Sequence, residues 1–128
     1  MAGIFQTRPI GTGGAAGSGG VKIYGVNVPA LNTVTIDTLP FVDHIAAKWL
    51  VTVVNPTSTK MQTYEVVADY LTGKAAPSYN VYGKIGDTGT DIKNSAQVVQ
   101  SGGNLLLQIT NYESVALTVD VLRFDLSA

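Results

Sequence analysis

The sequence contains no cysteine, and this absence excludes several kinds of chemistry at once. None of the 128 residues carries a thiol, so disulfides, thiolate nucleophiles and cysteine-bound zinc are ruled out together. We therefore expect stability to come from apolar burial and hydrogen bonding alone.

Charged residues are also scarce. They make up 13% of the chain, against roughly a quarter of a typical globular protein, and the formal net charge is −1 with no run of Lys or Arg. Because binding to a phosphate backbone needs clustered positive charge, the sequence predicts no nucleic-acid partner. Few charges among many small polar residues favour a surface partly covered by neighbours in an assembly; an ordinary extracellular-type β-domain is the alternative.

Long apolar runs are missing as well. No uncharged apolar stretch approaches the roughly 18 residues that suggest a membrane-spanning helix. The N-terminus has no basic segment followed by an apolar block, which a secretory signal peptide requires. We expect neither a membrane span nor a cleaved signal.

Residues that commonly bind metal ions or act as catalytic bases are few. His44 is the single histidine, and one histidine without cysteine partners makes neither a catalytic triad nor a zinc site. Asp87 and Asp91 stand in a glycine-containing turn, but the third ligand and the closing glutamate of a calcium loop are missing. A plain turn between strands is the favoured interpretation.

One further pair of carboxylates invites comparison with acid–base catalysis. Glu65 and Asp69 fall on one face of one predicted strand, about 13 Å apart at the rise of a strand. This separation is too large for the pair of a retaining glycosidase. We predict surface or interface charges here, and for the whole chain no catalytic residue, no cofactor and no metal site.

The first twenty residues differ in composition from the rest. Residues 11–20 read GTGGAAGSGG, which offers little to bury and loses much entropy on ordering. Residues 1–20 are therefore predicted to form an extended arm that is flexible by itself, with Ile4, Phe5 and Ile10 as apolar anchors. Extended, the arm would reach roughly 60 Å, enough to cross onto an adjacent subunit; a tail folded back on its own domain is the alternative.

From Val21 onward the sequence predicts strands separated by turn residues. Valine, isoleucine, threonine and aromatic residues concentrate in short segments, and Pro, Gly, Asn, Asp and Ser mark the breaks. Residues 41–49 are the one helix-tolerant stretch, with room for a single turn. The predicted strands are 21–28, 33–39, 46–55, 60–71, 79–84, 96–100, 104–111 and 115–124. This spacing predicts an all-β domain over residues 21–128, an eight-stranded antiparallel β-sandwich of jelly-roll-like or immunoglobulin-like type.

Two hairpins are predicted within this domain. The first runs over residues 46–70, with the Trp49 strand at the centre of a sheet and alternate residues of the return strand facing the core. The second joins the strands 104–111 and 115–124. In this second hairpin Leu106 and Leu122 interrupt the otherwise polar faces, so we predict that they lie in an oligomer interface.

Several short segments resemble small structural proteins of tailed bacteriophages. The similarity lies in the order of the elements: a strand that ends in a turn, a strand with a central Glu-x-x-Ala, a Tyr-Gly strand, a Leu-x-Leu-x-Ile-Thr strand and a last strand closing on arginine. The glycine-rich arm before a sandwich looks like the capsid decoration, or cement, type. The matching segments are Trp49 to Val54, Glu65 to Ala68, Tyr79 to Gly83, Leu105 to Thr110 and Val119 to Arg123.

The resemblance implies a non-enzymatic virion structural protein on the outer capsid surface. Such a protein would form a homotrimer and bridge subunits of the major capsid protein through its arm, with Ile4, Phe5, Arg8 and Ile10 as the binding positions. A tail, baseplate or fibre component is the first alternative, although the repeats typical of fibres are absent. A carbohydrate-binding β-sandwich module is the second, and it would need several aromatic rings exposed on one face.

Overall fold

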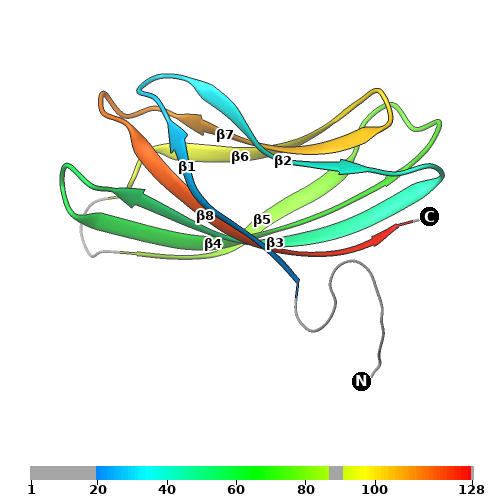
Figure 1. Ribbon diagram of the computed structural model, residues 1–128, viewed down its shortest axis with the longest axis horizontal. Coiled ribbons are helices and arrows are strands. Elements are labelled where there is room, and N and C mark those ends of the chain that lie inside the picture. The colour runs from blue at the N-terminus through cyan, green and yellow to red at the C-terminus, as the bar shows by residue number, and fades with distance from the viewer. Residues whose placement is uncertain (1–19, 87–90, 128) are drawn as a thin grey trace.

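The computed structural model describes residues 20–86 and 91–127, and all regular structure in this part of the chain is β-strand (Figure 1). Every predicted strand is present, and most differences are confined to the strand ends. The helical turn considered within residues 41–49 is wrong, because β3 already begins at His44 and alternates buried and exposed residues from there. The strands are β1 (Val21–Val28), β2 (Thr33–Pro40), β3 (His44–Asn55), β4 (Lys60–Leu71), β5 (Ser78–Gly86), β6 (Asn94–Ser101), β7 (Asn104–Asn111) and β8 (Leu117–Ser127).

The strands form two antiparallel sheets, which confirms the predicted sandwich. The larger sheet has the order β1-β8-β3-β4-β5 and the smaller has the order β2-β7-β6. Figure 1 shows the smaller sheet lying over one face of the larger one. The Trp49 strand, β3, is the middle strand of the larger sheet, as predicted.

The strand order favours the jelly-roll-like alternative over the immunoglobulin-like one. β1 pairs with β8, and β2 pairs with β7, so the first two strands run beside the last two in separate sheets. In an immunoglobulin domain the first two strands share one sheet. The middle of the chain is simpler than in two interlocked Greek keys, because β3, β4 and β5 follow one another as a meander.

The two predicted hairpins have different outcomes. The β3–β4 hairpin is confirmed, with its register running from His44 opposite Leu71 to Asn55 opposite Lys60. The Asn55 side chain closes its turn by accepting the backbone N–H groups of Thr57 and Ser58.

The second predicted hairpin is wrong, because β7 and β8 belong to different sheets. The cause lies at the end of β7, where the fully buried Asn111 side chain donates to the carbonyl groups of Val28, Pro29 and Val115. These bonds tie the chain to the end of β1 and lead it across to the other sheet.

The core lies between the sheets and follows the alternation of the strands. Tyr64, Val66, Ala68 and Tyr70 of β4 are all buried, as their spacing predicted. Alternate residues of β3 and β8 lie beside them on the same side of the larger sheet, and alternate residues of β7 face them from the smaller sheet. The indole of Trp49 is fully enclosed. The two layers therefore hold together by apolar burial, which is the dominant favourable term in folding.

Both edge strands of the larger sheet carry a bulge that contains a glycine. Tyr24 and Gly25 lie in the register break of β1, and Gly83 and Lys84 lie in that of β5. Gly25 and Gly83 have φ values of 67° and 68°, a conformation that glycine adopts without a steric penalty. Bulges on edge strands increase the local twist and make pairing with a foreign strand less regular.

Candidate interaction surface

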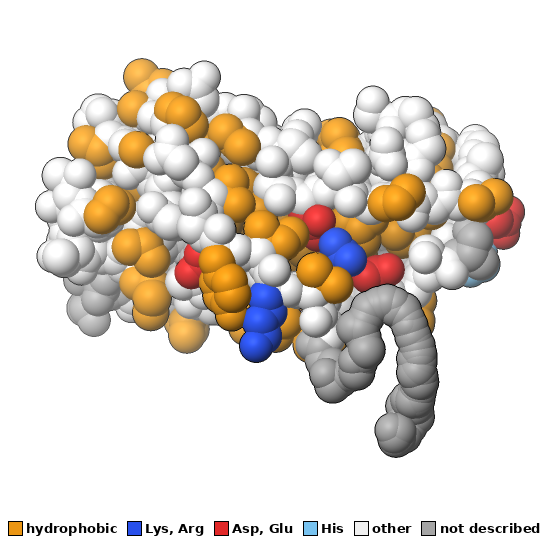
Figure 2. All heavy atoms as spheres, in the orientation of Figure 1, with side chains coloured by type: hydrophobic (Ala, Val, Ile, Leu, Met, Phe, Trp, Pro, Cys, Tyr) orange, Lys and Arg blue, Asp and Glu red, His pale blue; other side chains and the backbone are white. Residues whose placement is uncertain are grey.

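The outward face of the larger sheet carries a row of apolar side chains. The register places Leu50 opposite Leu122, and Lys48 between Phe124 and Val67. Figure 2 shows the sandwich from the side, with apolar side chains spread over both sheets and few charged ones among them. We call this set the outer surface: Ala46, Lys48, Leu50, Val67, Leu122, Phe124 and Leu126. The exposed fractions are 38% for Leu50, 39% for Val67, 45% for Phe124 and 77% for Leu126. Ala46 and Lys48 are also exposed, and Leu122 is half-buried.

A groove of about 740 Å³ crosses one end of the outer surface. Its lining combines exposed apolar side chains of β3, β4 and β8 with the first described residues of the chain. Such a groove buries apolar surface of a partner without requiring specific charges. The lining residues are Gly20, Val21, Ala46, Ala47, Lys48, Val67, Arg123, Phe124, Asp125 and Leu126.

A polar cluster stands on the same face beside the groove. Glu65 accepts a hydrogen bond of 2.8 Å from the Tyr82 hydroxyl and pairs with the Lys48 ammonium at 3.3 Å. The hydrogen bond from Tyr82, followed by the one from Lys48, lowers the pKa of Glu65, and the bond to Glu65 raises the pKa of Tyr82. All three side chains are open to solvent, so the cluster fixes their orientation more than it adds stability.

β5 is exposed along its whole length. All nine of its residues are exposed, because the three-stranded sheet does not extend over it. Tyr79 and Val81 lie opposite the buried Ala68 and Val66, on the inward side of the sheet, yet they remain 45% and 36% exposed. On the outward side Tyr82 is 43% and Ile85 is 68% exposed. We call Tyr79, Val81, Tyr82 and Ile85 the β5 surface.

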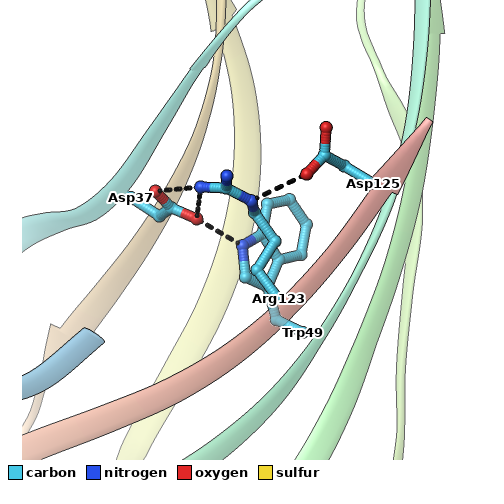
Figure 3. A network of polar contacts seen from close by, with 4 residues as sticks. All are labelled: Asp37, Trp49, Arg123 and Asp125. Carbon is cyan, nitrogen blue, oxygen red and sulfur yellow. Dashed lines mark hydrogen bonds and ion pairs between the residues drawn. The ribbon is translucent and has the colours of Figure 1, made fainter. Parts of the chain in front are cut away.

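A buried ionic network holds the two sheets together behind the groove. Arg123 of β8 donates to both carboxylate oxygens of Asp37 in β2 at 3.0 Å, and the Trp49 indole N–H donates to the same carboxylate at 3.0 Å. Arg123 Nε also donates to Asp125 at 3.0 Å. Figure 3 shows the guanidinium lying between the two carboxylates.

The environment of Arg123 favours its charged form. Burial alone would lower the pKa of Arg123, but the hydrogen bonds and the charge of Asp37, with a contribution from Asp125, raise it. The guanidinium is therefore charged at any pH at which the protein folds, and only 17% of the Arg123 side chain is exposed. Two of the lining residues of the groove, Arg123 and Asp125, are thus held rigidly from behind.

Sequence reasoning missed this network, although a signal was present. In β2 a bulge places Ile36 and Asp37 inward together, which breaks the period of two and hides the aspartate among apolar residues. An aspartate inside an otherwise apolar or threonine-rich strand, in a chain with few charges, needs a buried partner.

The predicted arm residues Ile4, Phe5, Arg8 and Ile10 lie outside the described residues. Of the two predicted interface residues, Leu122 belongs to the outer surface, opposite Leu50. Leu106 lies on β7 in the smaller sheet, between Thr38 and Val99. The structure therefore places the two leucines on different sheets and does not bring them together.

The remaining candidates that the structure describes lie at exposed positions. His44 is exposed at the start of β3, with Nδ1 3.0 Å from Asp43. Asp91 is exposed, and Asp87 lies outside the described residues, so the calcium loop stays untested. Within residues 20–86 and 91–127 there is no group of three or more His, Asp or Glu side chains arranged to hold a metal ion. The same residues contain no helix long and apolar enough to cross a membrane.

Comparisons with known proteins add little. No protein-family model matches the chain, and no curated protein matches it. Among solved structures, the tailspike protein of Acinetobacter phage vB_ApiP_P1 superposes with a TM-score of 0.39 at 11% identity, over 81% of this chain and 21% of the tailspike. The chain thus spans about a fifth of the tailspike, and a superposition this loose supports no conclusion about fold or function.

Proposed function

We propose that this protein is a non-enzymatic structural component of a bacteriophage virion. In this proposal it decorates the outside of the capsid and bridges subunits of the major capsid protein through residues 1–20. The observation that carries the proposal is the β5 surface. This edge strand is exposed at all nine residues and has large apolar side chains on both sides. Such a strand promotes aggregation of an isolated protein, whereas in an assembly it can form a subunit contact.

The exposed edge also suggests how copies would associate. Among the described strands, β5 has β4 as its single neighbour, so its outer backbone groups are open to another copy. Side-chain contact between three β5 surfaces around a threefold axis would bury Val81 and Ile85 and give the trimer that the resemblance implies. A full chain with Val81→Lys should then sediment as a monomer, whereas Val42→Lys, at an 85% exposed apolar site in the loop before β3, should leave the oligomer intact. Unchanged sedimentation of Val81→Lys would remove β5 from the interface.

The arm supplies the attachment to the shell and can be tested in the full chain. We expect the triple variant Ile4→Ser, Phe5→Ser and Ile10→Ser to fold normally and to lose binding to purified shells, because these three residues are the large aliphatic and aromatic side chains of the arm. Co-sedimentation with shells that lack the protein measures the occupancy directly.

A matched control keeps the same number of substitutions in the arm. Gln6→Ser, Thr7→Ser and Thr12→Ser leave the apolar anchors in place and should preserve the occupancy. Equal binding of both triple variants would contradict attachment through the arm. Gold labelling of whole particles separates a shell location from a tail, baseplate or fibre location.

A carbohydrate-binding module is the second candidate, favoured by one feature of β5. Tyr79 and Tyr82 leave opposite sides of the sheet, but both line a hollow of about 440 Å³ that also includes Asp69, Ser78 and Asn80. An aromatic ring beside polar groups is suited to a sugar. A thermal-shift panel of glycans tests this reading. A sugar-dependent rise in Tm that is lost in Tyr79→Ala would support it, and a flat panel would contradict it.

A further inference from the structure

We infer that, in the free protein, residues 4–10 of the N-terminal arm bind in the groove on the outer surface. Those residues lie outside the described part of the chain. The inference stands on the position of Gly20, on the chemistry of the groove and on the length of the linker between them. It concerns the free protein and does not depend on the proposed function.

Gly20 fixes the side of the sheet from which the arm departs. A Cβ placed on Gly20 would lie 2.6 Å from the carbonyl oxygen of Arg123, 3.0 Å from the Phe124 ring and 3.2 Å from a Leu122 methyl group. The backbone of Gly20 is thus pressed against the outer surface, with a φ of 89° that favours glycine. Gly20 itself lines the groove, so the end of the arm that joins β1 lies at the site.

The groove and the arm complement each other chemically. Phe124, Leu126 and Val67 expose between 39% and 77% of their surface in or beside the groove, and Ile4, Phe5 and Ile10 are the large aliphatic and aromatic residues of the arm. Burial of these groups against one another removes apolar surface from water on both sides.

An ion pair would set the orientation of the arm in the groove. Arg8 is the one charged side chain of residues 1–20. Asp69 is exposed on β4, directly opposite Ala46 of the groove. A guanidinium beside this carboxylate would orient the arm along the groove.

The linker has a suitable length for this arrangement. Ten residues, 11–20, separate Ile10 from the end of the arm, and most of them are glycine, alanine or serine. A linker of this composition spans about 17 Å on average, so the apolar segment stays near the groove at an effective concentration on the order of millimolar. A contact with an intrinsic Kd below about 1 mM would therefore be occupied most of the time within one molecule.

Docking of the arm also affects binding to any partner. The same apolar residues are the proposed capsid anchors, so the groove and the shell would compete for them. In the free protein the groove covers an apolar segment that would otherwise promote aggregation. A weakened groove would leave the arm more available to a shell.

Disulfide trapping tests the inference, and the natural absence of cysteine makes the test clean. Gln6→Cys with Ala46→Cys places one thiol beside the anchors and one in the groove without removing any large apolar group. The control pair, Gln6→Cys with Thr38→Cys, places the second thiol at an exposed site on the smaller sheet. Both pairs are oxidised in the full chain at micromolar concentration, and the products are separated on non-reducing gels.

We expect the Ala46 pair to form an intramolecular disulfide at least ten times faster than the Thr38 pair. Addition of Phe5→Ser and Ile10→Ser to the Ala46 pair should reduce its rate to that of the control. Equal rates for the two pairs would overturn the inference, and covalent dimers as the first product would show that the groove takes the arm of another copy. No shell is present, so neither result bears on capsid binding.

Discussion

Removal of the Asp37 carboxylate tests the network behind the groove. Asp37→Ala deletes three hydrogen bonds of 3.0 Å. It leaves the indole N–H of Trp49, which is 0% exposed, without its partner, and this costs about 1 to 3 kcal/mol. It also takes one carboxylate from the mostly buried Arg123, and a broken buried ion pair costs about 3 to 5 kcal/mol. Because Arg123 keeps Asp125, we expect a total of about 3 to 5 kcal/mol.

Urea denaturation followed by Trp49 fluorescence measures this loss. Asp125→Ala is the matched control, since that carboxylate is 28% exposed and accepts a single bond from Arg123; it should cost under about 1 kcal/mol. Arg123→Ala and the double variant with Asp37→Ala complete a cycle whose coupling energy should exceed about 1 kcal/mol. If Asp37→Ala costs no more than Asp125→Ala, the network does not hold the sheets together.

Three further predictions concern other parts of the fold. Burial raises the pKa of Tyr64, so above about pH 10 the unfolded state loses a proton that the folded state keeps. Between pH 8 and pH 11 the free energy of unfolding should therefore fall by about 1.4 kcal/mol more in the native chain than in Tyr64→Phe. The exposed control Tyr24→Phe should follow the native chain. Asn111→Ala should cost about 2 to 3 kcal/mol in urea denaturation, because it strands buried carbonyl groups, and a loss under about 1 kcal/mol would show that water replaces the amide. Thr59 has a φ of 53°, so Thr59→Gly should raise stability by about 0.5 to 1 kcal/mol, whereas Thr57→Gly in the same turn should lower it.

Local signals carried most of the fold prediction. Proline and asparagine mark the breaks, and β-branched residues mark the strands between them, which is why all eight strands were predicted. The alternation in β4 also predicted which side faces the core. Both kinds of signal act within one strand or between neighbours in the chain.

Pairing between distant segments was harder to predict. The alternation in β7 and β8 is the same whether the two strands pair with each other or lie in separate sheets, so the sequence suggested a hairpin that does not form. Asn111 determines that β7 and β8 lie in separate sheets, because its hydrogen-bond partners include Val28 and Pro29, which are distant in the sequence. The bulge at Asp37 likewise depends on Trp49 and Arg123, and no local pattern shows that contact.

The candidate surface was predictable only in part. Leu122 interrupts a polar pattern and does belong to the outer surface, but the exposure of β5 follows from the unequal width of the two sheets, three strands against five. That inequality arises from strand order, which local periodicity does not determine.

The most direct test of the proposed role is a reconstruction of the virion by cryo-electron microscopy. We predict β-sandwiches on the outside of the shell, with density for residues 1–19 lying against major capsid protein subunits. Sandwiches located in the tail, or arms that contact no capsid subunit on the assembled shell, would contradict the proposal.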